Sequence, residues 1–246
     1  MNMAATGFQR LQSVVSIPFV VETKGNLSIG TGKGDGLRDN LIIREGGPES
    51  DPVISGSSVK GMVRSTVESI LAEAKPGEVC VPFVCLGRDR NLPEGRKEDC
   101  GRSSRDNPCP ACRMFGNTEM SGRVSFRDAH LDEEEVPETV ERTHVALRRD
   151  TKTAAGGALM TMETLPPGVK FRGEVVLINP DDWMVGAVIH ALQLLPAIGL
   201  GAKKTSGYGE VEVEVFQAEY KLRPRDGSVK DNQHFYDAWA KMAKLT

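Results

Sequence analysis

The sequence contains no apolar run of the roughly 20 residues that a membrane-spanning helix needs. Residues 1–9 also lack the charged stretch followed by an apolar stretch that marks a secretory signal. We therefore expect a cytoplasmic protein that makes no contact with a membrane. An excess of positive charge is missing as well, because the formal net charge is −3. This balance argues against indiscriminate binding to nucleic acid, which depends on neutralising phosphates, but it leaves room for a local basic groove.

Disulfides are not expected, because the chain has five cysteines, an odd number, in a cytoplasmic context. Cys109 and Cys112 form a C-x2-C knuckle, a spacing typical of structural zinc sites. Cys100 precedes the knuckle, and either Cys80 or Cys85 can complete a set of four; His130 is a further candidate. One of the five thiols is surplus, so the sequence leaves the ligand set open. A metal here would be structural, because the surrounding segment, 79–122, has too little hydrophobic periodicity to fold on packing alone.

The usual nucleotide-binding loops are absent, yet residues 199–209 carry four glycines on a G-x-G-x5-G-x-G frame. A P-loop or a dinucleotide fingerprint would open a helix, whereas this segment follows an apolar helix-like stretch and precedes a valine-rich strand. Lys203, Lys204 and Ser206 lie within the frame and offer cations and a hydroxyl to phosphates. Such a loop suits an extended anion such as RNA. The alternative, a tight turn with incidental lysines, does not account for four glycines.

Apolar periodicity predicts an α+β chain with the element order βαββαβ. The expected strands cover residues 11–22, 123–129, 169–178 and 208–215, with a further short strand at 41–44. The first helix is expected to begin at Ser57 or Ser58, the second at 179–182, and a terminal helix to span 231–245. This order is that of the ferredoxin-like palm, which RRM proteins share. We expect a single domain, 1–246, with insertions at about 79–122 and 139–165.

Two further groups of basic residues are candidates for phosphate contacts. Lys60 and Arg64 lie one turn apart on the first predicted helix, beside Ser57 and Ser58 at its start. An ordinary solvated helix face is the alternative for this pair. The segment 139–162 is polar and long for a plain connection, which is typical of functional loops. Its basic candidates are Arg142, His144, Arg148, Arg149 and Lys152.

Four stretches together resemble the CRISPR-associated RAMP superfamily. Residues 54–64 are similar to its "IPGSSLKGxxR" signature, and residues 109–116 to its "C-x2-C-R-L-F-G" segment. Residues 149–166 resemble its thumb region, and residues 199–209 its C-terminal glycine-rich motif. The resemblance runs from about residue 20 to residue 215, and it is strongest to the repeated backbone subunit of type III effector complexes.

The resemblance implies a filament of copies along a guide RNA (crRNA), with other effector subunits as partners. Each copy would insert a thumb hairpin, with small and apolar groups near 154–162 as wedge, into the guide–target duplex. It also implies that a loop aspartate, with Mg²⁺ or another divalent cation, cuts the target RNA once per subunit. Asp39 matches the position of that aspartate, and Asp35 is the alternative in the same loop.

Three other functions stay open at this point. The first is a guide-binding subunit of the same complex that does not cleave. The second is an endonuclease that processes the CRISPR repeat transcript, which the cysteine-rich insertion and residues 54–64 argue against. The third is an unrelated zinc-stabilised scaffold, which an absence of copurifying RNA would favour.

Overall fold

The computed structural model describes residues 10–47, 50–80, 96–97, 108–117, 120–132 and 137–245, with side chains left out at 96–97 and 156–158. The strands are β1 (Val14–Thr23), β2 (Val53–Ile54), β3 (Val79–Cys80), β4 (Arg96–Lys97), β5 (Val124–Phe126), β6 (Ala129–Leu131), β7 (Val140–Leu147), β8 (Ala154–Thr164), β9 (Lys170–Ile178), β10 (Val211–Val215) and β11 (Glu219–Leu222). The helices are α1 (Gly56–Ala74), α3 (Pro110–Phe115), α4 (Asp182–Gln193), α5 (Leu195–Ile198) and α6 (Asn232–Ala243), and a 3₁₀ turn, η2, covers Lys204–Ser206.

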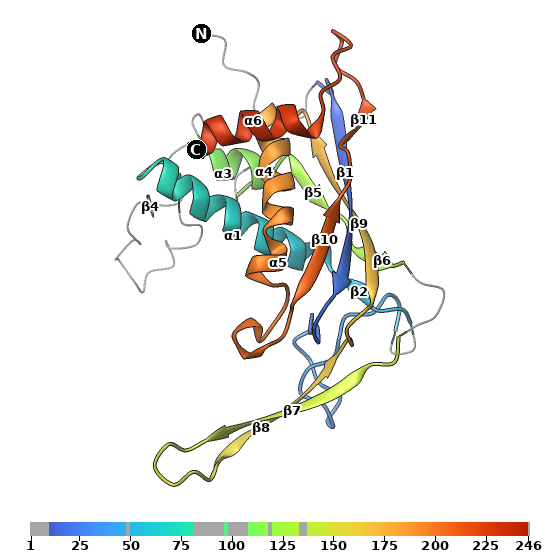
Figure 1. Ribbon diagram of the computed structural model, residues 1–246, viewed down its shortest axis with the longest axis vertical. Helices are drawn as coiled ribbons and strands as arrows, with labels where there is room; N and C mark the ends of the chain where they lie inside the picture. The colour runs from blue at the N-terminus through green and yellow to red at the C-terminus, as the bar shows by residue number, and fades with distance from the viewer. Residues whose placement is uncertain are drawn as a thin grey trace.

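A central antiparallel sheet carries the fold, with strand order β10-β1-β9-β6-β2; β11 also pairs with β1, and β5 with β9. The helices cover one face of this sheet (Figure 1). Residues of β1 alternate between the faces, and Ile17, Phe19 and Val21 are buried under the helices. The predicted mixture of helices with an antiparallel sheet is confirmed.

The helices reach the sheet through regular apolar stripes. Val59, Val63 and Val67 of α1 recur every four residues, and all three are fully buried. Helix α6 crosses α4 at Gly186, where an added Cβ would lie 2.0 Å from the carbonyl oxygen of Phe235. His190 accepts a hydrogen bond at Nδ1 from Trp239 Nε1 over 2.8 Å, and burial lowers the pKa of this imidazole. His190 is partly buried and packs against α6.

The cysteine-bearing segment contributes to the core instead of lying outside it. Ala111, Cys112, Met114 and Phe115 of α3 are buried and belong to the main hydrophobic cluster. Arg113, on the same short helix, pairs with Asp181 at the start of α4 over 2.6 Å. The sequence did not predict α3, because six residues are too few to show a helical period.

Several predicted boundaries were wrong. The N-cap of α1 is Ser55, whose hydroxyl accepts the N–H of Ser58, and not Ser57 or Ser58. The strand expected at 123–129 is two strands, β5 and β6, interrupted where Asp128 turns to accept the N–H of Gly56 over 2.7 Å. The strand expected at 41–44 is absent; Ile42 and Arg44 form only isolated bridges. The first strand begins at Val14 and the last predicted strand at Val211, each three residues later than expected.

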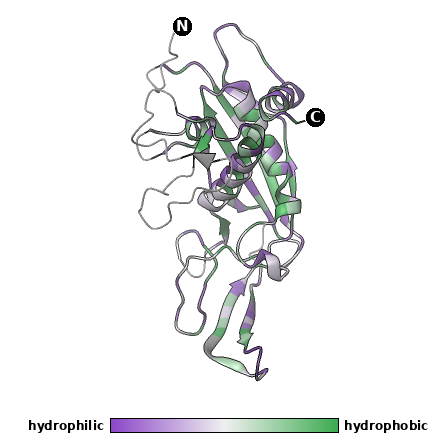
Figure 2. Cartoon of the chain, turned by 90° about the vertical axis from the view of Figure 1, so that its left-hand side faces the viewer, coloured by the Kyte–Doolittle hydropathy of each residue, from purple (hydrophilic) through white to green (hydrophobic). Residues whose placement is uncertain are grey.

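A long two-stranded hairpin of β7 and β8 extends beyond one end of the sheet (Figure 1). Its turn lies at residues 148–153, so residues 154–162, expected to supply the wedge, form strand β8 and not the tip of the hairpin. Apolar residues stay exposed along the hairpin (Figure 2): Val145 is 48%, Leu147 59% and Leu159 66% exposed. Among the described helices, none combines the length and apolar character that crossing a bilayer requires.

Candidate functional site

Three segments that are distant in sequence meet beyond the end of the sheet from which the hairpin extends (Figure 1). They are the loop after β1, the base of the hairpin, and the glycine loop, 199–209. Leu27 and Leu165 pair through their main chains, which joins the first segment to the second. Gly209 donates its N–H to the carbonyl of Asn26 over 2.9 Å, which joins the first to the third. Sequence-predicted residues from all three segments are thereby brought together.

Asp39 is fixed to strand β8 by two hydrogen bonds. Its N–H donates to the carbonyl of Thr161 over 2.8 Å, and its Oδ2 accepts the N–H of Thr161 over 2.7 Å. The next residue, Asn40, accepts the N–H of Glu163 over 3.0 Å, so the loop runs alongside β8 like a short extra strand. Asp39 is exposed, and its Oδ1 has no hydrogen-bond or ion-pair partner among the described residues. One carboxylate oxygen is thus held in place while the other faces solvent.

Both carboxylate oxygens of Asp35, the alternative acid, accept hydrogen bonds within its own loop. Its Oδ2 accepts from Arg38 Nη2 over 2.6 Å and from Nε over 3.0 Å. Its Oδ1 accepts the N–H groups of Leu37 and Arg38 over 3.0 and 2.8 Å. The hydrogen bonds from Arg38 lower the pKa of Asp35 to about 2, so the carboxylate stays ionised and paired. Asp39 is therefore the better placed of the two acids to meet a metal ion or a hydroxyl.

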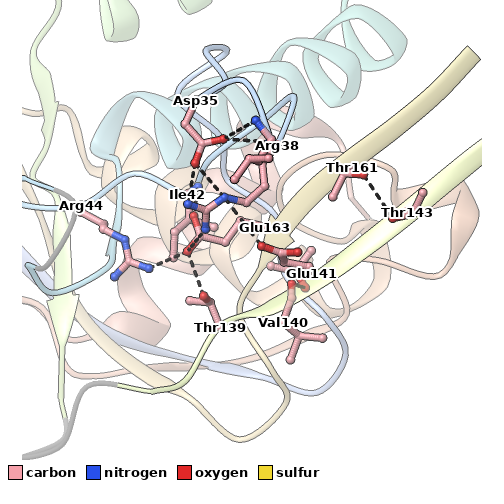
Figure 3. Close-up of polar contacts among 12 residues, drawn as sticks. Asp35, Arg38, Ile42, Arg44, Thr139, Val140, Glu141, Thr143, Thr161 and Glu163 are labelled. Atoms are coloured by element: carbon pink, nitrogen blue, oxygen red, sulfur yellow. Dashed lines mark hydrogen bonds and ion pairs between the residues drawn. The ribbon is translucent and has the colours of Figure 1, made fainter. Parts of the chain in front are cut away.

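A buried glutamate, Glu163, organises the polar contacts beneath this loop (Figure 3). Its side chain is only 3% exposed, and it accepts from Arg44 Nη2 over 2.6 Å. It also accepts from Thr139 Oγ1 over 2.8 Å and from the N–H of Ile42 over 3.1 Å. Burial by itself raises the pKa of Glu163, but these hydrogen bonds outweigh it and the pKa is lowered. Sequence reasoning missed Glu163, because a single acid in a strand of mixed character gives no signal of burial.

The glycine loop needs its glycines for two different reasons. All four, Gly199, Gly201, Gly207 and Gly209, have positive φ. At Gly209 an added Cβ would also lie 2.0 Å from the carbonyl oxygen of Leu200, whereas at Gly207 it would meet nothing within 4 Å. Gly209 is therefore required by both conformation and space.

We predict that Gly209→Ala lowers the free energy of unfolding more than Gly207→Ala does. The change at Gly207 adds only the strain of a left-handed backbone, about 1–2 kcal/mol. The change at Gly209 adds the same strain and forces Leu200 to move. Gly209→Ala therefore loses at least ~1 kcal/mol more of the free energy of unfolding than Gly207→Ala does. Urea unfolding of both variants beside wild type measures the difference, and equal losses would contradict the packing argument.

The predicted phosphate-binding lysines of this loop lie beside helix α1. Lys203 is exposed, whereas Lys204 is half-buried and its Nζ lies 3.4 Å from Sδ of Met62. Ser206 is exposed at the end of the 3₁₀ turn. The loop therefore contacts α1 at Met62, two residues after Lys60.

Tyr208, after the last lysine, contacts the base of the hairpin. Its hydroxyl lies 2.9 Å from Nε2 of His144, and the two rings are 5.3 Å apart between centroids. The sequence analysis gave His144 as a candidate for phosphate contacts but did not predict its contact with Tyr208. The contact links the glycine loop to β7, so a ligand on one element also lies near the other.

The predicted residues of α1 divide into two groups. Ser57 is exposed, and Ser58 and Lys60 are partly exposed toward solvent. Arg64 turns inward instead: its Nε donates to Glu68 over 2.7 Å and its Nη1 to the carbonyl of Gly116 over 3.3 Å. Its guanidinium also lies 5.8 Å from the centroid of the Phe115 ring.

The start of α1 and the hairpin differ in how open they are to an anion. Asp128 already accepts the first N–H of α1, that of Gly56, which leaves less of the helix terminus for an anion.

On the hairpin, Arg142, Arg148, Arg149 and Lys152 are exposed, as a surface for phosphates requires. Met162, considered for a wedge or for packing, is 1% exposed at the hairpin base and is a packing residue.

Three of the five cysteines gather in one buried cluster. The sulfurs of Cys80 and Cys112 lie 3.4 Å apart, and those of Cys80 and Cys109 lie 3.6 Å apart. Zinc–sulfur bonds of about 2.3 Å in a tetrahedron separate the sulfurs by about 3.8 Å, so this cluster fits three ligands of such a site. Hydrogen bonding with Cys112 and Cys80 lowers the pKa of Cys109, which favours a thiolate there.

The described residues supply three of the candidate ligands. Cys80 belongs to the cluster, whereas Cys85 and Cys100 lie outside the described residues. His130 lies outside the cluster, and its Nδ1 is 3.0 Å from Oε2 of Glu45, so the structure does not support it as a ligand.

The chain belongs to the RAMP superfamily, whose family model matches residues 20–212. This match confirms the family that the sequence motifs indicated. Among curated proteins, the chain is similar to the CRISPR system Cms endoribonuclease Csm3 of Methanothermobacter thermautotrophicus. The two are 27% identical over 246 residues, and the match covers 88% of each chain.

Proposed function

We propose that this protein is a guide-RNA-binding backbone subunit of a type III CRISPR effector complex, and that it cleaves complementary target RNA at Asp39. One observation carries the cleavage part: Asp39 is exposed, held by Thr161 through Oδ2, and leaves Oδ1 without a partner among the described residues. The name of the similar archaeal protein, an endoribonuclease of a CRISPR system, supports this assignment. The strand order β10-β1-β9-β5 with α1 and α4 on one face supports a ferredoxin-like palm.

The guide would bind where the glycine loop passes α1. Lys203, Lys204 and Ser206 lie on the loop, and Ser57, Ser58 and Lys60 lie on the helix beside it. These groups recognise phosphates and hydroxyls and not base edges, so binding tolerates any guide sequence. The choice of target then comes from base pairing with the guide, as in other RNA-guided systems. The basic hairpin, linked to the loop by His144 and Tyr208, reaches toward the paired strands.

Asp39 has two chemical tasks available to it. Its free oxygen can bind a divalent cation such as Mg²⁺, which, when bound, stabilises charge on the scissile phosphate. The same carboxylate can accept a proton from the 2′-hydroxyl next to that phosphate. Either task requires an ionised, solvent-facing oxygen at a fixed position, and the main-chain bonds to Thr161 supply the fixed position. The cysteine cluster takes no part, because it is buried in the core.

The experiment that tests the proposal is cleavage by the assembled complex. We expect labelled complementary RNA to give products at regular intervals in Mg²⁺, because copies along one guide place one Asp39 per copy. We expect no products in EDTA, which removes the divalent cation. Tight target binding without products would identify a guide-binding subunit that does not cleave. Cleavage of the repeat transcript without a metal would indicate a processing enzyme, and absence of copurifying RNA a scaffold.

A further inference from the structure

The loop that carries Asp39 is held by hydrogen bonds within the loop, but its tip packs few side chains. Gly32 and Gly36 have positive φ, and an added Cβ at either would meet nothing within 4 Å. Leu37, at the tip, is 88% exposed. Glycine-rich backbone with few packed side chains has high conformational entropy. The hydrogen bonds within the loop fix its own shape, and the contacts between the loop and the hairpin fix the place of Asp39 against β8.

Arg38, the residue before Asp39, lies among three carboxylates from different parts of this region (Figure 3). Its Nη2 is 2.6 Å from Oδ2 of Asp35, within the loop. Its Nε is 3.8 Å from Oε1 of Glu141 on β7, and its Nη1 is 3.8 Å from Oε1 of Glu163 on β8. The guanidinium is 29% exposed, so solvent screens these pairs only in part. One cation thus attracts the loop and both hairpin strands to the same point.

We infer that Arg38 is a positioning residue for Asp39, which fixes the loop against the hairpin and keeps Asp35 away from the cleavage site. This inference rests on the function proposed above. Without the guanidinium, Asp35 and Glu141 lose their shared counter-charge and repel each other, while Glu163 keeps Arg44. The loop then loses the tie next to Asp39, and an unpaired Asp35 adds negative charge where a phosphate must approach. A carboxylate displaced by about 1 Å can cost on the order of 100-fold in rate, so a measurable loss is expected.

The test compares Arg38→Gln with Arg38→Lys in the assembled complex. A matched control is Arg172→Gln, which removes an exposed arginine of β9 that pairs with Asp132, away from the loop. In single-turnover cleavage we expect Arg38→Gln to lower the maximal rate on the order of tenfold. Its target-binding constant stays within about twofold of wild type, and Arg38→Lys, which keeps the charge, recovers most of the rate. Arg172→Gln behaves as wild type.

Amide hydrogen exchange of the purified full chain tests the same inference independently of cleavage. The N–H groups of Asp39 and Thr161 are hydrogen-bonded between loop and hairpin, and we expect both to exchange about tenfold faster in Arg38→Gln. Unchanged exchange at these two amides overturns the positioning role, even if the wild-type complex does not cleave at all. Wild-type cleavage rates in Arg38→Gln, or a lysine variant no better than the glutamine variant, overturn it as well. If the wild-type complex gives no products but exchange is faster in Arg38→Gln, the proposed cleavage is wrong and the positioning of the loop by Arg38 still holds.

Discussion

Replacing Asp39 by asparagine lowers target cleavage by about 10³-fold, and target binding changes by less than about twofold. The amide oxygen of the new side chain can still accept the N–H of Thr161, so the substitution removes the charge and leaves the loop in place. Loss of a group that transfers a proton or binds the metal typically costs about 10²–10⁴ in rate. Single-turnover cleavage with saturating guide complex, beside a filter-binding measurement of target affinity, separates the chemical step from binding.

The neighbouring acid supplies the control for this result. Asp35→Asn keeps an oxygen for the N–H groups of Leu37 and Arg38 and removes only the negative charge. Since Asp35 is turned toward Arg38, we expect its variant to retain cleavage within about threefold of wild type. If Asp35→Asn abolished cleavage and Asp39→Asn did not, the roles of the two acids would be exchanged. Equal and partial losses in both variants would indicate that neither carboxylate is the catalytic group.

Sequence could place both acids in one loop but could not choose between them on physical grounds. What separates them is a partner: Arg38 for Asp35, and the main chain of Thr161, more than a hundred residues away, for Asp39. Glu163 was missed for the same reason, because its partners Arg44 and Thr139 come from separate segments. Local sequence patterns depend on residues that are close along the chain, whereas these contacts join residues that are distant in the sequence.

Regular apolar periodicity, in contrast, predicted the main elements well. The stripe of Val59, Val63 and Val67 identified α1, and the alternation in residues 208–215 identified β10. Periodicity failed for short elements such as β2 and β11, where two and four residues give no period to detect. It also failed for the long strands β7 and β8, whose polar and glycine-bearing sequence was taken for a loop. Arg64 shows a related limit: spacing placed it on the face of Lys60, yet packing against Phe115 turned it inward.

We expect the loss of one cysteine of the buried cluster to have the largest effect on stability, because the cluster can hold three of the four ligands of a zinc ion. Cys112→Ser replaces a fully buried thiol of the cluster, and we expect the variant to purify without zinc and to unfold at much lower urea concentration. Structural zinc contributes about 10–16 kcal/mol of apparent binding free energy in zinc-finger peptides, which is comparable to the whole stability of a domain. Helix α3 carries Cys112 and packs Met114 and Phe115 into the core, so loss of a bound metal would weaken the attachment of this helix. Metal analysis and urea unfolding measure the two effects together.

The same measurement identifies the fourth ligand. Three sulfurs are in place, and Cys85 and Cys100 are the two remaining cysteines of the chain. If one of them completes the site, its serine variant loses zinc and the other variant keeps a full equivalent per chain. A site of four thiolates also predicts weaker zinc retention as the pH falls, because protons compete with the metal for each sulfur. Wild-type protein that holds no zinc, or a Cys112→Ser variant as stable as wild type, would show that packing alone holds α3 in the core. In that case the close approach of Cys80 to Cys112 would be ordinary contact between buried thiols.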